Sequence, residues 1–237
     1  MSGRTRRAWL LSPLLLALAA CASGPEAAAP GTATVWGSLK LVPREGVTPA
    51  KPGSSSYGDR RMRDVEMVDY THPGFAVVFV EAEPLPTGRV DIAIRTSRVT
   101  RFEPAMAAAG AGASLVIENA SEEAHVLSYP AAGLIRRLAP GETVELPIAR
   151  AGEQGLFLLD QVDAAATLFA APGPFAVISS TGGFELRGLA PGRYDVRAWH
   201  PRFPPAAQSV ELAAGSRVQL DIEVGVGHAA TEHAHEH

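Results

Sequence analysis

The chain contains very little cysteine: a single residue, Cys21, in a total of 237. One thiol excludes an intramolecular disulfide, and it leaves the rest of the chain without a thiolate for catalysis or metal binding. Other common enzyme signatures are also missing, including G-x-S-x-G, the phosphate-binding loop G-x-x-x-x-G-K-[ST] and H-E-x-x-H. We therefore expect a protein that is not an enzyme, with catalysis by dispersed residues as the open alternative.

Aromatic residues and long helical repeats are also scarce. Aromatic side chains make up 6% of the chain, whereas there are 23 glycines and 19 prolines. Few windows longer than a turn or two repeat apolar residues at the 3.6-residue period of a helix, so a helical bundle is excluded. The formal charge is −4 and the body has no basic cluster, which argues against a nucleic-acid partner. The composition predicts an all-β protein of short strands and turns.

The first 20 residues have the pattern of a secretory signal. Three arginines precede an apolar segment, Trp9 to Leu18, which is too short for a comfortable membrane span. The following Leu18-Ala19-Ala20-Cys21 resembles a bacterial lipobox, and this resemblance implies lipid attachment at Cys21. Ala22 stands where an inner-membrane retention signal usually has aspartate, so the family pattern implies the periplasmic face of the outer membrane. An ordinary cleaved signal is the alternative.

The segments on either side of the body have distinct compositions. Residues 21–34 are rich in Ala, Pro and Gly and predict a flexible tether. The predicted attachment to the membrane is therefore through the lipid at Cys21. Residues 226–237 form a tail with four histidines, His228, His233, His235 and His237. Histidines at every second position allow a flexible chain to place several imidazoles around one copper or zinc ion. A disordered polar tail without a metal would have the same composition.

Short strands are predicted throughout the body. Alternating or continuous apolar runs indicate strands at 35–42, 75–81, 89–95, 114–118, 125–128, 143–148, 156–159, 184–186, 194–199 and 218–224. Polar, glycine- and proline-bearing segments separate them, the longest at residues 43–73. Pro104 to Ala109 and Val162 to Phe169 are the two places where a helical turn is expected. A Greek-key β-sandwich is the natural architecture.

The stretch FEPAMAAAGAGASLVIENASEEAHVLSYP, residues 102–130, resembles the first half of cupredoxins of the methylamine-utilisation or plastocyanin-like periplasmic type. Those proteins have F-x-P, a glycine-led strand, an asparagine, a short polar turn and a copper-binding histidine. Asn119 and His125 occupy the last positions of this pattern. The resemblance implies a cupredoxin-like Greek-key module and makes His125 a candidate metal ligand.

A second block resembles the closing strands of a carboxypeptidase-regulatory-like, immunoglobulin-like β-sandwich. It consists of FAVISSTGGFELRGLAPGRYDVRAWHP, residues 175–201, and SVELAAGSRVQLDIEV, residues 209–224. The resemblance implies a discontinuous sandwich, residues 35–87 and 173–225, into which a cupredoxin-like module, residues 88–172, is inserted. Two domains in series are the alternative.

The copper ligands that the cupredoxin resemblance implies are largely lost. In that family a C-x-x-H-x-x-M run completes the site, and the matching positions here are Leu159, Val162 and Ala165. A blue-copper centre needs two imidazoles and a thiolate, so His125 alone would bind weakly. A structural role is therefore the main interpretation of His125, and His200 at a strand end is interpreted as a fold feature.

Three hypotheses for the function follow. The first is a non-enzymatic, lipid-anchored periplasmic binding or scaffold protein with a degenerate cupredoxin-like module and a protein partner. The second is periplasmic handling of copper or zinc through the histidine-rich tail, with or without His125. The third, implied by the resemblance alone, is an accessory subunit of a periplasmic redox system. No cofactor is certain at this stage.

Overall fold

The computed structural model describes residues 31–44, 68–178 and 181–226, and the regular secondary structure of these residues consists almost entirely of strands. One short 3-10 turn, η1 (Pro130–Ala132), interrupts them. The predicted all-β fold class is confirmed. No helix in the described part of the chain is long and apolar enough to cross a membrane.

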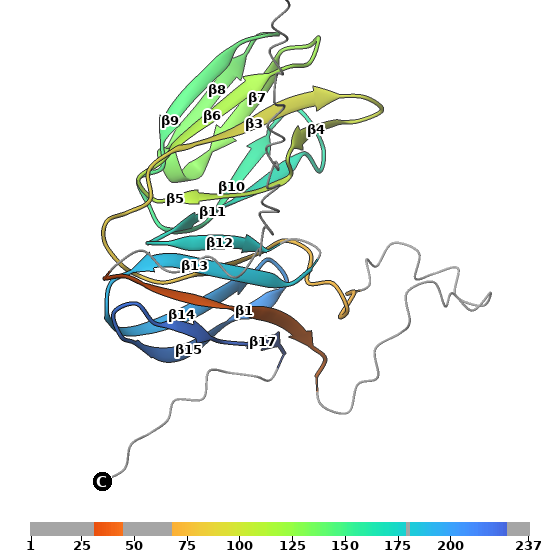
Figure 1. Ribbon diagram of the computed structural model, residues 1–237. Helices are drawn as coiled ribbons and strands as arrows, with labels where there is room; N and C mark the ends of the chain where they lie inside the picture. Colours follow the sequence, from red (N-terminus) through yellow and green to blue (C-terminus); the bar gives the residue numbers. More distant parts are fainter. Residues whose placement is uncertain (1–30, 45–67, 179–180, 227–237) are drawn as a thin grey trace, which may run out of the picture.

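Strands from both ends of the described chain form one pair of sheets, which we call the terminal sandwich (Figure 1). One sheet contains β13 (Gly183–Leu189), β1 (Ala33–Val42), β16 (Arg217–Gln219) and β17 (Ile222–Gly225). The other contains β12 (Phe175–Ile178), β2 (Ala76–Phe79), β14 (Gly192–His200) and β15 (Phe203–Leu212). Buried side chains from both sheets, such as Leu39 and Val196, form the core between them.

The strands between residues 89 and 171 form a second pair of sheets, the central sandwich (Figure 1). Its five-stranded sheet has the order β5 (Met106–Gly110), β11 (Ala165–Ala171), β10 (Gly152–Leu158), β7 (His125–Tyr129) and β8 (Leu134–Leu138). Its four-stranded sheet has the order β4 (Thr100–Glu103), β3 (Arg89–Thr96), β6 (Ser114–Asn119) and β9 (Thr143–Pro147). Inward-facing residues such as Ile92, Ile117 and Leu127 fill the space between the sheets.

Two expectations about local structure are wrong. The alanine-rich stretches predicted to hold helical turns are instead β5 and β11, which pair in parallel through Thr167 opposite Met106 to Ala171 opposite Gly110. Alanine has the highest intrinsic helix propensity, but intrinsic propensity is a small effect, and tertiary packing overrides it where small side chains are buried on a sheet. The first strand also begins at Ala33, within the segment expected to be a tether, because Ala33 and Thr34 are buried.

An aromatic cluster joins the two sandwiches. Phe169 of β11 stacks on Trp199 of β14, with ring centroids 4.7 Å apart, and its centroid lies 5.2 Å from that of Phe79 in β2. The indole N–H of Trp199 donates a hydrogen bond to Glu153 of β10 at 3.3 Å. Aromatic pairs of this kind add stabilisation beyond the area that they bury. The cluster therefore packs the two sandwiches directly against each other.

The chain passes between the sandwiches at residues 80–88 and again at 172–174, and these connections lie very close together. The backbone N–H of Val80 donates to the carbonyl of Pro174 at 3.1 Å. A Cβ atom at Gly173 would lie 2.3 Å from the carbonyl oxygen of Val80 and 2.6 Å from the backbone nitrogen of Ala82. Both neighbours are backbone atoms, so the position requires glycine.

Gly173→Ala should lower the free energy of unfolding by about 1–3 kcal/mol, because the new methyl group overlaps backbone that cannot move aside. Chemical denaturation measures the change. Gly112→Ala is the matched control: its Cβ would meet atoms only at 3.5 Å, an ordinary contact distance. Equal stability of the two variants would contradict the close approach of the connections.

Candidate functional site

His125 is positioned by the turn that precedes it and by the register of β7. In that turn the side-chain amide of Asn119 donates to the carbonyls of Glu123 at 2.8 Å and Leu138 at 3.0 Å. Its carbonyl oxygen accepts hydrogen bonds from the backbone N–H and the hydroxyl of Ser121. Asn119 therefore fixes the turn between β6 and β7. His125, Leu127 and Tyr129 occupy alternate positions of β7, lie on the same face of the strand and are all buried.

The imidazole of His125 is buried and bonded to a carboxylate. Its exposure is 1%, and Nδ1 lies 2.8 Å from Oδ2 of Asp160, in the turn between β10 and β11. Oδ1 of Asp160 accepts the backbone N–H of Val126 at 2.7 Å. Since an ionised carboxylate only accepts hydrogen bonds, Nδ1 of His125 carries the proton and donates it. The carboxylate of Asp160 thus binds both the His125 ring and the Val126 backbone at the start of β7.

The other ring nitrogen of His125 has no hydrogen-bond partner. Nε2 is buried, and no donor or acceptor in the described residues reaches it. With the proton on Nδ1, Nε2 is a lone-pair acceptor. A second proton on Nε2 would place an unpartnered N–H donor in the interior, which costs free energy. The packing therefore favours the neutral ring with the proton on Nδ1.

The pKa of Asp160 is lowered below its ordinary value of 3.8. Partial burial acts to raise it, but the hydrogen bonds from the Val126 N–H and the His125 ring stabilise the ionised carboxylate and outweigh burial. The interaction therefore contributes stability when Asp160 is ionised. That contribution is lost as the pH falls through the lowered pKa.

The residues around His125 do not fit a cupredoxin copper centre. Nδ1 is already bonded to Asp160, and Leu159 and Val162 are exposed by 58% and 92%. Ala165, at the start of β11, is also exposed. No group of three His, Cys, Asp or Glu side chains with the geometry of a metal site occurs in residues 31–44, 68–178 and 181–226. The arrangement can hold a loop in place, and we derive no copper chemistry from it.

Asp160 is the site residue that the sequence interpretation missed. The sequence pattern predicts that apolar residues at 159–165 replace metal ligands, and it gives no role to the carboxylate at position 160. The available signal was weak: a single acid directly after the apolar run Leu156 to Leu159, with no periodicity to connect it to His125. The register of β10 against β7, with Leu158 opposite Leu127, brings the two residues together.

His200 has a local role in the terminal sandwich. Its exposure is 6%, Nε2 donates to the carbonyl of Pro73 at 3.1 Å, and Nδ1 accepts the backbone N–H of Arg202 at 3.0 Å. Burial lowers the pKa of His200, although the Pro73 carbonyl acts in the opposite direction. Both ring nitrogens are therefore occupied in the neutral ring. This agrees with the interpretation of His200 as a fold feature.

The remaining predicted site residues cannot be placed. Cys21, proposed to carry lipid, and the tail histidines His228, His233, His235 and His237 lie outside the described residues. Their roles stay predictions from the sequence.

Comparisons with known proteins bear on the fold alone. No protein-family model matches the chain, and no curated protein matches it. Among solved structures, the chain is similar to a purple cupredoxin from Nitrosopumilus maritimus, with 12% identity, a TM-score of 0.31, and coverage of 35% of this chain and 99% of that one. A pseudoazurin from Sinorhizobium matches with 16% identity and a TM-score of 0.27, over 37% of this chain and 76% of that one. A copper nitrite reductase from Nitrosomonas europaea matches with 13% identity and a TM-score of 0.28, over 36% of this chain and 41% of that one. At these values the similarity says nothing about ligand or activity.

Asp160→Asn should lower the free energy of unfolding at pH 7 by about 1–2 kcal/mol, because it removes the charged acceptor of two hydrogen bonds. The difference from the unmodified protein should begin to narrow below about pH 4, where Asp160 of the unfolded chain becomes protonated, and it should disappear below the lowered pKa of Asp160 in the folded chain. Denaturation curves at several pH values measure both effects.

Asp163→Asn is the matched control for this prediction. It removes one charge from the same turn, and asparagine tolerates the positive φ of 62° at that position. If Asp163→Asn reproduced the effect of Asp160→Asn, net charge would explain the loss of stability and the specific bond to His125 would not.

Proposed function

We propose that this chain is a non-enzymatic, lipid-anchored periplasmic binding or scaffold protein whose cupredoxin-like module serves as an interaction surface. The observation that carries the proposal is the contact of His125 Nδ1 with Asp160 at 2.8 Å. The residue that best fits the metal-binding pattern is thereby used to fasten a loop. What the protein offers to other molecules is then the surface of its two filled sandwiches.

The interior of each sandwich supports a structural role. The described cores consist of packed aliphatic and aromatic residues, and the polar groups buried in the central sandwich are largely paired. For example, the Tyr129 hydroxyl donates to Gln154, which in turn donates to the Arg150 carbonyl. Buried polar groups that are satisfied in this way specify one packing arrangement. A rigid body suits a protein that acts by presenting a surface.

The membrane attachment rests on the sequence of the N-terminus. The proposal places lipid on Cys21 and the body on the periplasmic side of the outer membrane, because the residues before Cys21 resemble a lipobox. A lipid-anchored scaffold needs no membrane-spanning segment in its body. The expected partner is a periplasmic or membrane protein, and no nucleic-acid partner is proposed.

A second candidate function is metal handling by the tail. Four histidines and two glutamates in the last ten residues favour it, since imidazole and carboxylate are ligands for copper and zinc. For this second function the tail binds the metal, and His125 is not a ligand. A role as an accessory subunit of a periplasmic redox system is the remaining alternative.

Copper and zinc binding should separate these functions. If the tail handles metal, calorimetry should show that the mature chain and its His125→Gln variant bind each metal identically and that a chain ending at Gly225 binds much less. If the protein is a scaffold without a metal function, none of the three chains should bind either metal tightly. The physical reason is that the His125 ring is buried and bonded to Asp160, whereas the sequence of the tail supplies four imidazoles. Stoichiometric copper binding by the shortened chain, abolished by His125→Gln, would contradict the proposed function.

A further inference from the structure

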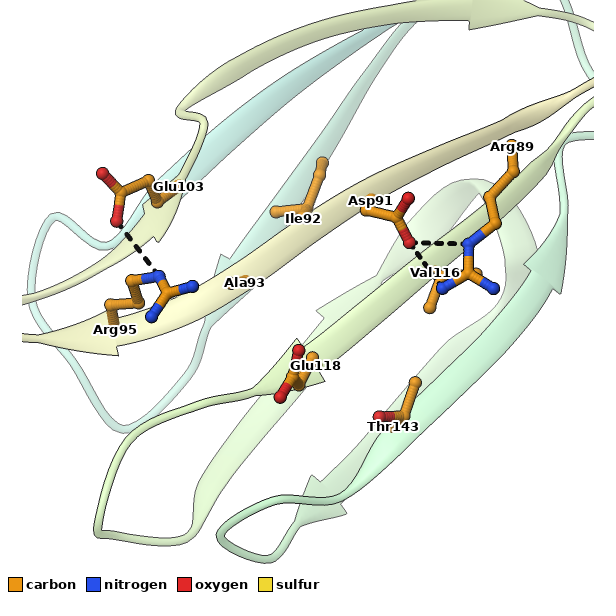
Figure 2. Close-up of a pocket in the computed structure, with 9 residues that line it drawn as sticks. All are labelled: Arg89, Asp91, Ile92, Ala93, Arg95, Glu103, Val116, Glu118 and Thr143. Carbon is orange, nitrogen blue, oxygen red and sulfur yellow. Dashed lines mark hydrogen bonds and ion pairs between the residues drawn. The ribbon is translucent and has the colours of Figure 1, made fainter.

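The outer face of the four-stranded sheet of the central sandwich contains a hollow of about 260 Å³. It lies over β3, β4, β6 and β9, on the face of the sheet that carries the exposed side chains of Arg89, Asp91 and Glu118 (Figure 2). Two arginines and three acids line it, together with Ile92, Ala93, Val116 and Thr143. The hollow is slightly smaller than the usual range for drug-sized ligands, and its size suits a single long side chain.

The hollow exists because a small residue interrupts a row of long ones. On β3 the outward positions are Arg89, Asp91, Ala93 and Arg95, which alternate with buried residues. Ala93 lies directly opposite Glu103 on β4 and opposite Glu118 on β6. Its short methyl side chain therefore lies at the bottom of the hollow, between two carboxylates on neighbouring strands.

Most charges around the hollow neutralise one another. Arg95 pairs with Glu103 at 3.2 Å at one end, and Arg89 pairs with Asp91 at 2.6 Å at the other (Figure 2). Glu118 forms no ion pair within the part of the chain that the structure describes. The lining thus has one carboxylate in excess, which favours a cationic group.

A hydroxyl group lies beside the free carboxylate. Thr143 of β9 is the cross-strand neighbour of Glu118, and Figure 2 shows the two side chains next to each other at the edge of the hollow. The carboxylate and the hydroxyl oxygen can both accept hydrogen bonds from one donor group with several N–H bonds. A guanidinium has five N–H donors in a planar arrangement that matches a carboxylate bidentately.

We propose that this hollow binds an arginine side chain of a protein partner, with the guanidinium on Glu118 and Thr143 and the aliphatic stem over Ala93 and Val116. The inference deepens the proposed scaffold function and rests on it. An anionic ligand fits poorly, because both arginines of the lining already have carboxylate partners. Protein is the source of the arginine because the hollow lies open on a broad sheet face, where the rest of a partner surface can rest on the flanking strands.

The test uses the full mature chain labelled with ¹⁵N and the peptide acetyl-Gly-Arg-Gly-amide as the probe. Titration should shift the backbone amide signals of Ala93, Val116 and Glu118. The peptide acetyl-Gly-citrulline-Gly-amide, which has the same shape without the charge, should shift them much less. Binding should weaken as salt is added, because exposed charge pairs are screened.

Two matched variants locate the interaction. Glu118→Gln should weaken binding of the arginine peptide roughly three- to five-fold, the size expected for one exposed charge pair. Glu145→Gln removes a carboxylate from the same sheet face but outside the hollow, and it should leave binding unchanged. Equal weakening by both variants, equal binding of the citrulline peptide, or shifts confined to another face would overturn the proposal.

The failure of this inference can be told apart from failure of the scaffold function. Copper binding at His125 would refute the scaffold function and would leave the peptide titration unchanged, because the two sites do not share residues. An absent or non-specific titration with the metal results as expected would refute only the arginine site.

Discussion

The hydrogen bond between His125 and Asp160 is the interaction on which the character of the central sandwich depends. It joins the first residue of β7 to the turn that connects β10 and β11, two segments 35 residues apart in the sequence. The same carboxylate binds the Val126 N–H, and the backbone N–H of Leu159 donates to the Val126 carbonyl at 2.9 Å. These bonds close one end of the sandwich. The bond to Asp160 also occupies Nδ1 of His125, so the imidazole has a structural role.

The inner and outer faces of the central sandwich differ in character. The inner faces are filled by the core, and the outer face of the five-stranded sheet makes the aromatic contact with the terminal sandwich through Phe169 and Trp199. The outer face of the four-stranded sheet is charged, open and hollowed over Ala93. The proposed interaction surface is this outer face, and its hollow shares no residue with the pair formed by His125 and Asp160.

Much of the fold was predictable from the sequence, and the exceptions have physical causes. Alternating patterns such as residues 89–95 identify strands with one buried face, because the two faces of a sheet meet different environments. The alanine-rich strands β5 and β11 were interpreted as the places that could hold a helical turn, since alanine carries little information about which surface it will pack against. Asn119 and His125 were recognisable as a pair, and the structure adds that Asn119 bonds the turn before His125.

Only one of the two residues of the candidate site was predictable from the sequence. His125 stands out as the one histidine at the start of a clear strand, whereas Asp160 is an acid in a turn, and only the pairing of β10 with β7 brings it near. The hollow over Ala93 was not foreseen for a similar reason. Its walls come from four strands, and the cross-strand neighbours of Ala93 are known only once the register is known.

The most direct test of the account is the protonation state of the His125 ring, measured by ¹H–¹⁵N correlation NMR before and after addition of one equivalent of copper(I). The account predicts a neutral ring with the proton on Nδ1, and ring signals that copper leaves unchanged. A ring protonated on Nε2, with Nδ1 shifted by the metal, would contradict it, because His125 would then be a ligand.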